Sequence, residues 1–100
     1  MNKTHVINTK GLRVKWTGKI TSVESKQGDL ASVMIDEIYN VDHLQYISFE
    51  TSTNDYPFLK IIKKGELVTV TGTIGKVTGI GVNLINVEEL IKEDEPQIFI

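Results

Sequence analysis

Basic and hydroxyl side chains alternate with apolar ones between residues 12 and 21, and this spacing suits contact with a row of phosphates. The polar positions are Arg13, Lys15, Thr17, Lys19 and Thr21. Residues two apart in a β-strand share a face, so these five would form one basic strip. Lysine and arginine neutralise phosphate charges, and the strip therefore indicates contact with a polyanion. The alternative is a solvated basic face.

The residue types needed for catalysis or for metal binding do not occur in suitable groups. The chain has no cysteine and two histidines, His5 and His43, without carboxylates at metal-ligand spacing. No Gly-Lys-Ser/Thr sequence follows the glycines near residue 80, so a phosphate-binding loop is not indicated. No base accompanies the serines and threonines in a nucleophilic pattern. We therefore expect a protein that is not an enzyme and that holds no metal and no cofactor.

Charge is segregated along the chain, although the net charge is only -2. Residues 1–27 carry six basic side chains and one acid, whereas residues 28–62 carry six acids and one lysine. A protein that coats nucleic acid without selectivity would be basic throughout. If this chain binds a polyanion, it should therefore do so on a limited surface.

The composition is that of one small soluble domain. Apolar residues make up 40% of the 100 positions and charged residues 24%, which is ordinary for globular proteins. No apolar run approaches the ~20 residues of a membrane span, and residues 1–11 lack the apolar run of a signal peptide. A chain without cysteine suits a reducing compartment. We expect a cytoplasmic protein that is not bound to a membrane, and its oligomeric state stays open.

Alternating apolar residues predict five strands, two of which are interrupted by glycine. The first strand runs for about eleven residues from Leu12, and the fourth follows Gly65. Gly18 and Gly72 lie near the middle of these strands, where a sharply coiled strand needs a residue without a side chain. The other strands are expected at residues 30–39, 44–50 and 82–87, with a turn at 78–81 before the last.

The same alternation predicts which side chains face the core. In the second strand Ala31, Val33 and Ile35 are expected inside and Met34 outside; in the third, Ile47 and Phe49 inside and Tyr46 and Ser48 outside. In the fourth, Val68, Val70 and Ile74 are expected on a buried face and Thr69, Thr71 and Thr73 on a wet face. Trp16 is in phase with the apolar residues Leu12, Val14 and Ile20, which favours a core role over a stacking platform.

A short helix is expected between the third and fourth strands. The polar loop at residues 51–55 can cap a helix that begins near Tyr56, and Pro57 is tolerated in the first turn. Gly65 is a suitable terminator. The apolar face of this helix would consist of Phe58, Ile61 and Ile62.

This order of strands and helix resembles the OB-fold, an all-β, five-stranded Greek-key barrel with one short helix between strands three and four. Residues 59–74 resemble the stretch Leu-x-x-Ile-Lys-Lys-Gly-x-x-Val-x-Val-x-Gly-x-Ile of small bacterial OB domains similar to the tRNA-anticodon-binding family. The resemblance covers about residues 12–90. It implies an OB domain at residues 11–91, between a flexible arm at residues 1–10 and an acidic and apolar tail at residues 92–100.

The resemblance also implies where a nucleic acid would lie. In OB domains the nucleic acid crosses β-strands two and three. It is held by the loop between strands one and two and by the loop between strands four and five. The implied contact residues are Arg13, Lys15, Lys19, Lys26, Gln27, Met34, Tyr46, Ser48, Lys76 and Thr78. The cations would follow phosphates, and Tyr46 would stack on a base. Negative charge near the same groove would come from Asp29, Asp36, Asp42 and Glu50.

The C-terminal tip is a candidate for partner binding. Acidic residues and Pro96 precede Ile98, Phe99 and Ile100, and this arrangement resembles the tips by which bacterial single-strand-binding proteins recruit partners. The apolar residues would fill a partner's pocket whose rim is basic. A terminus that is frayed or folded back on the barrel is the alternative.

Two functions from different classes follow. The first is a non-catalytic OB module that binds single-stranded DNA or RNA weakly through the basic face of the first strand. The second is an accessory subunit that docks on a larger protein of DNA replication or repair, which a mixed-charge surface and the apolar tip favour. Oligosaccharide binding would need an exposed aromatic pair, and only Tyr46 is a plausible member.

Overall fold

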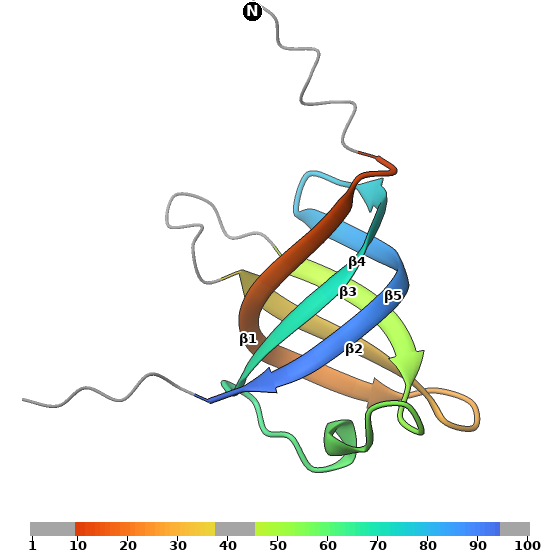
Figure 1. Ribbon diagram of the computed structural model, residues 1–100, viewed down its shortest axis with the longest axis vertical. Helices are drawn as coiled ribbons and strands as arrows, with labels where there is room; N and C mark the ends of the chain where they lie inside the picture. Colours follow the sequence, from red (N-terminus) through yellow and green to blue (C-terminus); the bar gives the residue numbers. More distant parts are fainter. Residues whose placement is uncertain (1–9, 38–45, 95–100) are drawn as a thin grey trace, which may run out of the picture.

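The computed structural model describes residues 10–37 and 46–94, which form a closed five-stranded barrel (Figure 1). Its elements are β1 (Arg13–Ser25), β2 (Leu30–Glu37), β3 (Tyr46–Ser52), the 3-10 turn η2 (Pro57–Lys60), β4 (Leu67–Val77) and β5 (Gly81–Glu93). Around the barrel the order is β1-β2-β3-β5-β4, and every pair is antiparallel except β3 with β5. This arrangement confirms the OB-like Greek-key barrel expected from the sequence.

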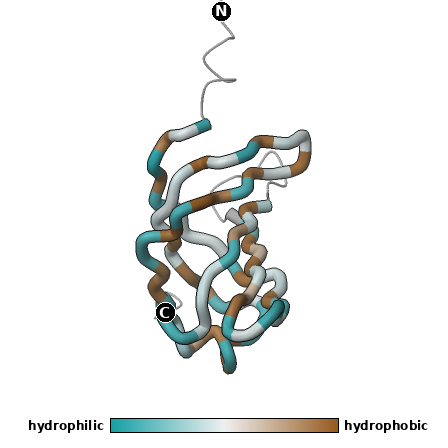
Figure 2. Tube along the Cα trace, turned by 90° about the vertical axis from the view of Figure 1, so that its right-hand side faces the viewer, coloured by the Kyte–Doolittle hydropathy of each residue, from teal (hydrophilic) through white to brown (hydrophobic). Residues whose placement is uncertain are grey.

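Alternating side chains from all five strands, together with Leu59 of η2, fill the core. Its buried apolar residues are Ile20, Val33, Ile35, Ile47, Phe49, Leu59, Val68, Val70, Ile74, Val82, Leu84 and Leu90. The sets predicted to face inward on β2 and β3 are confirmed. The alternation is visible along the chain trace in Figure 2, where apolar and polar residues follow one another within the strands. Trp16 is half-buried and packs against this core, as its phase predicts.

The two glycines expected to allow coiling lie at close approaches between strands. Gly18 is the point where β1 pairs with β4 on one side and β2 on the other, and a Cβ there would overlap the carbonyl oxygen of Asp36. At Gly72 the register between β4 and β5 shifts, and a Cβ would lie 3.3 Å from the carbonyl oxygen of Ile85. Gly18 therefore needs a residue without a side chain, as predicted, and at Gly72 a Cβ would be tightly packed against β5.

The wet face predicted for β4 is wrong in the middle of the strand. Thr69 and Thr71 are only 5% and 7% exposed. Strand β4 lies between β1 and β5, and Thr71 is flanked by Lys15 on one strand and by Glu89 on the other. The hydroxyl oxygens of Thr69 and Thr17 lie 2.7 Å apart, so the buried polar group has a partner.

The helix predicted between β3 and β4 is only a single 3-10 turn. Leu59 is its buried residue, whereas Ile61, which was expected on the apolar face, is 80% exposed. Beyond the turn, the backbone N–H of Gly65 donates to the carbonyl oxygen of Ile20 at 2.8 Å. This hydrogen bond fixes the chain just before β4. A longer helix of one or two turns would gain too few hydrogen bonds of its own to compete with that tertiary contact. Gly65 does not terminate this turn, contrary to the expectation, because the turn already ends at Lys60; with a φ of 94° it lies instead in the connection to β4.

Several strand ends differ from the prediction, and two of the differences change which residues are buried or paired. Leu12 is 53% exposed rather than part of the core, because β1 begins only at the next residue. Strand β5 continues to Glu93 instead of ending at Val87, since its second half pairs with β4. Residues 1–9 of the N-terminal arm, Asp42 and the tip at Ile98–Ile100 lie outside the described residues.

Candidate nucleic-acid interface

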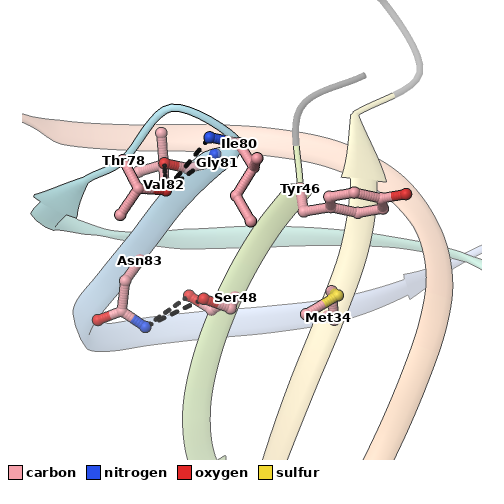
Figure 3. Close-up of a pocket in the computed structure, with 8 residues that line it drawn as sticks. All are labelled: Met34, Tyr46, Ser48, Thr78, Ile80, Gly81, Val82 and Asn83. Carbon is pink, nitrogen blue, oxygen red and sulfur yellow. Dashed lines mark hydrogen bonds between the residues drawn. The ribbon is translucent and has the colours of Figure 1, made fainter.

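A surface pocket of about 130 Å³ lies where β2, β3 and the β4–β5 hairpin meet (Figure 3). It is lined by Met34, Tyr46, Ser48, Thr78, Ile80, Gly81, Val82 and Asn83. Four of the predicted contact residues are therefore brought together here, namely Met34, Tyr46, Ser48 and Thr78. They come from three separate segments of the chain. Pairing of β2 with β3 places Met34 opposite Ser48, and pairing of β3 with β5 brings the hairpin beside them.

The hairpin wall of the pocket is held by hydrogen bonds within its turn. The N–H of Thr78 donates to the carbonyl oxygen of Gly81 at 2.8 Å. The Thr78 hydroxyl oxygen accepts the N–H of Gly81 at 3.2 Å and that of Ile80 at 3.4 Å. Across the pocket, the N–H of Tyr46 donates to the carbonyl oxygen of Ile80 at 3.2 Å. The turn is therefore closed on itself and tied to β3.

Ser48 and Asn83 interact across the parallel pair of β3 and β5 (Figure 3). The side-chain nitrogen of Asn83 donates to the Ser48 carbonyl oxygen at 3.3 Å and to its hydroxyl oxygen at 3.1 Å. Because the Ser48 hydroxyl accepts this bond, its own proton points elsewhere. That proton has no acceptor among the residues that the structure describes, so Ser48 offers a hydrogen-bond donor in the pocket.

Two predicted lysines lie on the outer surface beside this pocket. Lys76 is the cross-strand partner of Asn83. Lys19 is the partner of Asp36, which is in turn the partner of Tyr46. Directly opposed residues in paired strands share a face, and both lysines are exposed. The pocket is therefore flanked by one cation on the β4 side and one on the β1 side.

Carboxylates also occupy this face, as the sequence predicted for Asp36 and Glu50. One carboxylate oxygen of Asp36, Oδ1, is buried without a hydrogen-bond partner among the described residues. Glu50 is exposed on β3, in register with Ser32 of β2. These carboxylates repel a phosphate from the surface of the sheet itself. Uncharged groups of a ligand are therefore favoured there.

Arg13 and Lys15 lie away from the pocket. Arg13 Nε lies 2.8 Å from Glu88 Oε2, and this hydrogen bond raises the pKa of Arg13 and lowers that of Glu88. Lys15 pairs with Thr71 of β4. It lies in the first half of β1, before the point at which β1 begins to pair with β2. The basic strip of β1 is therefore divided between two sides of the barrel.

Lys26 lies in the connection between β1 and β2. Its Nζ is 3.8 Å from Glu24 Oε1, and it does not line the pocket. Of the four basic residues predicted on β1 and in the first loop, only Lys19 adjoins the strands that carry the pocket.

The sequence did not single out four lining residues, Ile80, Gly81, Val82 and Asn83, as contacts. The first two appeared only as members of a turn. Asn83 carried a usable signal, because it is a polar residue between the inward-facing Val82 and Leu84 and must therefore face outward. Its position beside Ser48 depends on the parallel pairing of β3 with β5, which no local pattern indicates.

Asp29 connects the β1–β2 turn to the loop after β3. Its carboxylate accepts hydrogen bonds from the Ser52 hydroxyl and from Asn54 Nδ2, the latter at 3.0 Å. Its carbonyl oxygen accepts the Thr53 N–H at 2.8 Å. The hydrogen bond from Ser52 lowers the pKa of Asp29 below its ordinary value.

We expect Asp29→Asn to make stability less dependent on pH in acid. The unfolded pKa of aspartate is about 3.9, and a lowered folded pKa contributes stability that is present above that pH and is lost as pH falls through the folded value. The thermal midpoint of the variant should therefore fall less than that of the parent protein below about pH 4. Glu50→Gln removes an exposed charge outside this network and should keep the parent's slope. An unchanged slope in Asp29→Asn would contradict the expectation.

Within residues 10–37 and 46–94, no helix is long and apolar enough to cross a membrane. The same residues contain no group of three histidine, cysteine or acidic side chains placed to hold a metal ion. The chain matches no protein-family model, and a search of curated proteins found no match either.

Proposed function

We propose that the protein binds single-stranded nucleic acid, DNA or RNA, without catalysing a reaction. One base would occupy the pocket, and the adjacent phosphates would lie beside Lys19 and Lys76. The observation that supports this most is the convergence of Met34, Tyr46 and Ser48 at the β4–β5 hairpin, because oligonucleotides bind this face of OB-folds. We also propose membership of the small bacterial tRNA-anticodon-binding-like OB family, on the residues at 59–74.

Each lining group has a role in this proposal. A base stacked on Tyr46 would contribute about 1–3 kcal/mol, a term that tolerates any sequence because every base has an aromatic face. Ile80 and Met34 would cover the ring edge and exclude water. Ser48 would donate a hydrogen bond to a base acceptor. Contact is centred on β2 and β3 rather than on the basic strip of β1, since Arg13 is already paired with a carboxylate.

Combining Lys19→Ala with Lys76→Ala is expected to weaken binding and to flatten its dependence on salt. Neutralising two phosphates of a single strand gives a slope of about −1.4 in log K against log salt concentration, and the double variant should approach zero. The measurement is fluorescence anisotropy of a labelled single strand of about 20 nucleotides, titrated with protein at several salt concentrations.

The matched control combines Arg13→Ala with Lys15→Ala, which also removes two cations of the barrel surface. This variant should keep the parent's slope, because both residues lie on the β1–β4 side. If the control loses the slope and the Lys19 and Lys76 variant keeps it, the strand follows the basic strip of β1 instead of the pocket.

A second candidate is an accessory subunit that docks on a larger protein of DNA replication or repair. The observation in its favour is the apolar hairpin, where Val77 and Ile80 are 49% and 72% exposed. Ile98, Phe99 and Ile100 are the further contact proposed for this function. Absence of binding to any strand at tens of micromolar protein would exclude the first function and leave this one.

A further inference from the structure

We propose that the pocket is a subsite for thymine, so that the protein binds a thymine strand more tightly than the same strand with uracil. This inference rests on the proposed binding of single strands and names the base that the pocket prefers. Thymine carries a carbonyl oxygen, O4, next to a methyl group at C5 on one edge of its ring. Uracil lacks the methyl group, and cytosine has an amino group in place of O4.

The pocket carries the complement of that edge. Met34 and Ile80 contribute apolar side chains from β2 and the hairpin. Ser48 lies among them and offers a hydroxyl donor, because its oxygen accepts the bond from Asn83. A ring stacked against Tyr46 can therefore place a carbonyl oxygen at Ser48 and a methyl group against the apolar side chains. The Ser48 hydroxyl would donate to O4 of thymine, and the neighbouring apolar side chains would contact its methyl group.

The backbone that carries the Ile80 side chain is held by hydrogen bonds before a ligand arrives. The N–H of Ile80 donates a hydrogen bond to the Thr78 hydroxyl oxygen, and its carbonyl oxygen accepts one from the Tyr46 N–H. Its side chain extends from the hairpin between Thr78 and Tyr46 (Figure 3) and is 72% exposed. Covering it with a methyl group removes apolar surface from water on both partners. Because the backbone at Ile80 is already fixed, it adds little ordering cost on binding.

The test compares three labelled strands of equal length with the same deoxyribose backbone, carrying thymine, uracil or cytosine throughout. Anisotropy titrations at one salt concentration give the three dissociation constants. We expect the thymine strand to bind about fourfold more tightly than the uracil strand, which is the effect of one buried methyl group on an equilibrium. The uracil strand should in turn bind more tightly than the cytosine strand.

Two variants assign the preference to the pocket. Ile80→Ala should bring the thymine-to-uracil ratio close to one, and Ser48→Ala should reduce the difference between uracil and cytosine. Ile61→Ala is the matched control, since Ile61 is an exposed isoleucine just after η2, at the opposite end of the barrel from the hairpin (Figure 1). It should leave all three ratios unchanged.

Each outcome separates the inference from the proposed function. Equal binding of thymine and uracil strands would overturn the thymine subsite and leave single-strand binding intact. A ratio that survives Ile80→Ala would also overturn it, because the preference would then arise outside the pocket. Absence of binding to all three strands would overturn the proposed function itself.

Discussion

Phe49→Ala is expected to lower the free energy of unfolding by about 3–5 kcal/mol. Phe49 is 1% exposed and heads the largest fully buried side chains of the barrel. It lies on β3 directly opposite Val33 of β2. The barrel wall is held in place by pairing between strands, so it cannot collapse into the space that the ring leaves. A small domain is stable by about 5–15 kcal/mol in total, and the variant would keep little of that margin.

Urea unfolding followed by circular dichroism measures this loss. Phe58→Ala is the control, because Phe58 packs against the core from η2 but is only half-buried. Its truncation should lower the free energy of unfolding by less than that of Phe49, since water already reaches part of the ring. Equal losses for the two variants would show that the barrel wall adjusts around a cavity at Phe49.

Gly81→Ala is expected to destabilise the barrel by about 1–3 kcal/mol and to abolish binding at the pocket. A Cβ at Gly81 would overlap the carbonyl oxygen of Tyr46 and lie 3.2 Å from its amide nitrogen. Among the residues that the structure describes, three pairs join β3 to β5, and Gly81 with Tyr46 is the first of them. The backbone cannot relieve the overlap without separating these strands. The hairpin would then move away from Tyr46 and open the pocket.

Gly79→Ala provides a close control two residues away in the same turn. A Cβ at Gly79 would meet no atom within 4 Å, so this variant should keep the parent's stability and affinity. Urea unfolding and the anisotropy titration are to be made on both variants. If Gly81→Ala binds single strands as the parent does, the pocket is not the binding site, whatever its effect on stability.

The predicted contact set and the pocket overlap only in part, and the reason is physical. Facing directions follow from alternation along a strand, so Met34, Tyr46 and Ser48 could be assigned to the outer surface of the barrel in advance. Arg13 and Lys15 share the face of Lys19 along β1, but β1 pairs first with β4 and then with β2. Residues on one strand face can therefore lie on different sides of a closed barrel.

Local spacing was enough to predict the number of strands, the inward set on β2 and β3, and the need for glycine at Gly18. These properties depend on backbone geometry over a few residues, which local spacing reports directly. The tertiary structure decided the burial of Thr69, the reduction of the expected helix to one turn, and the meeting of Ser48 with Asn83. Each of these depends on pairing between strands distant in sequence, and no local pattern carries that register.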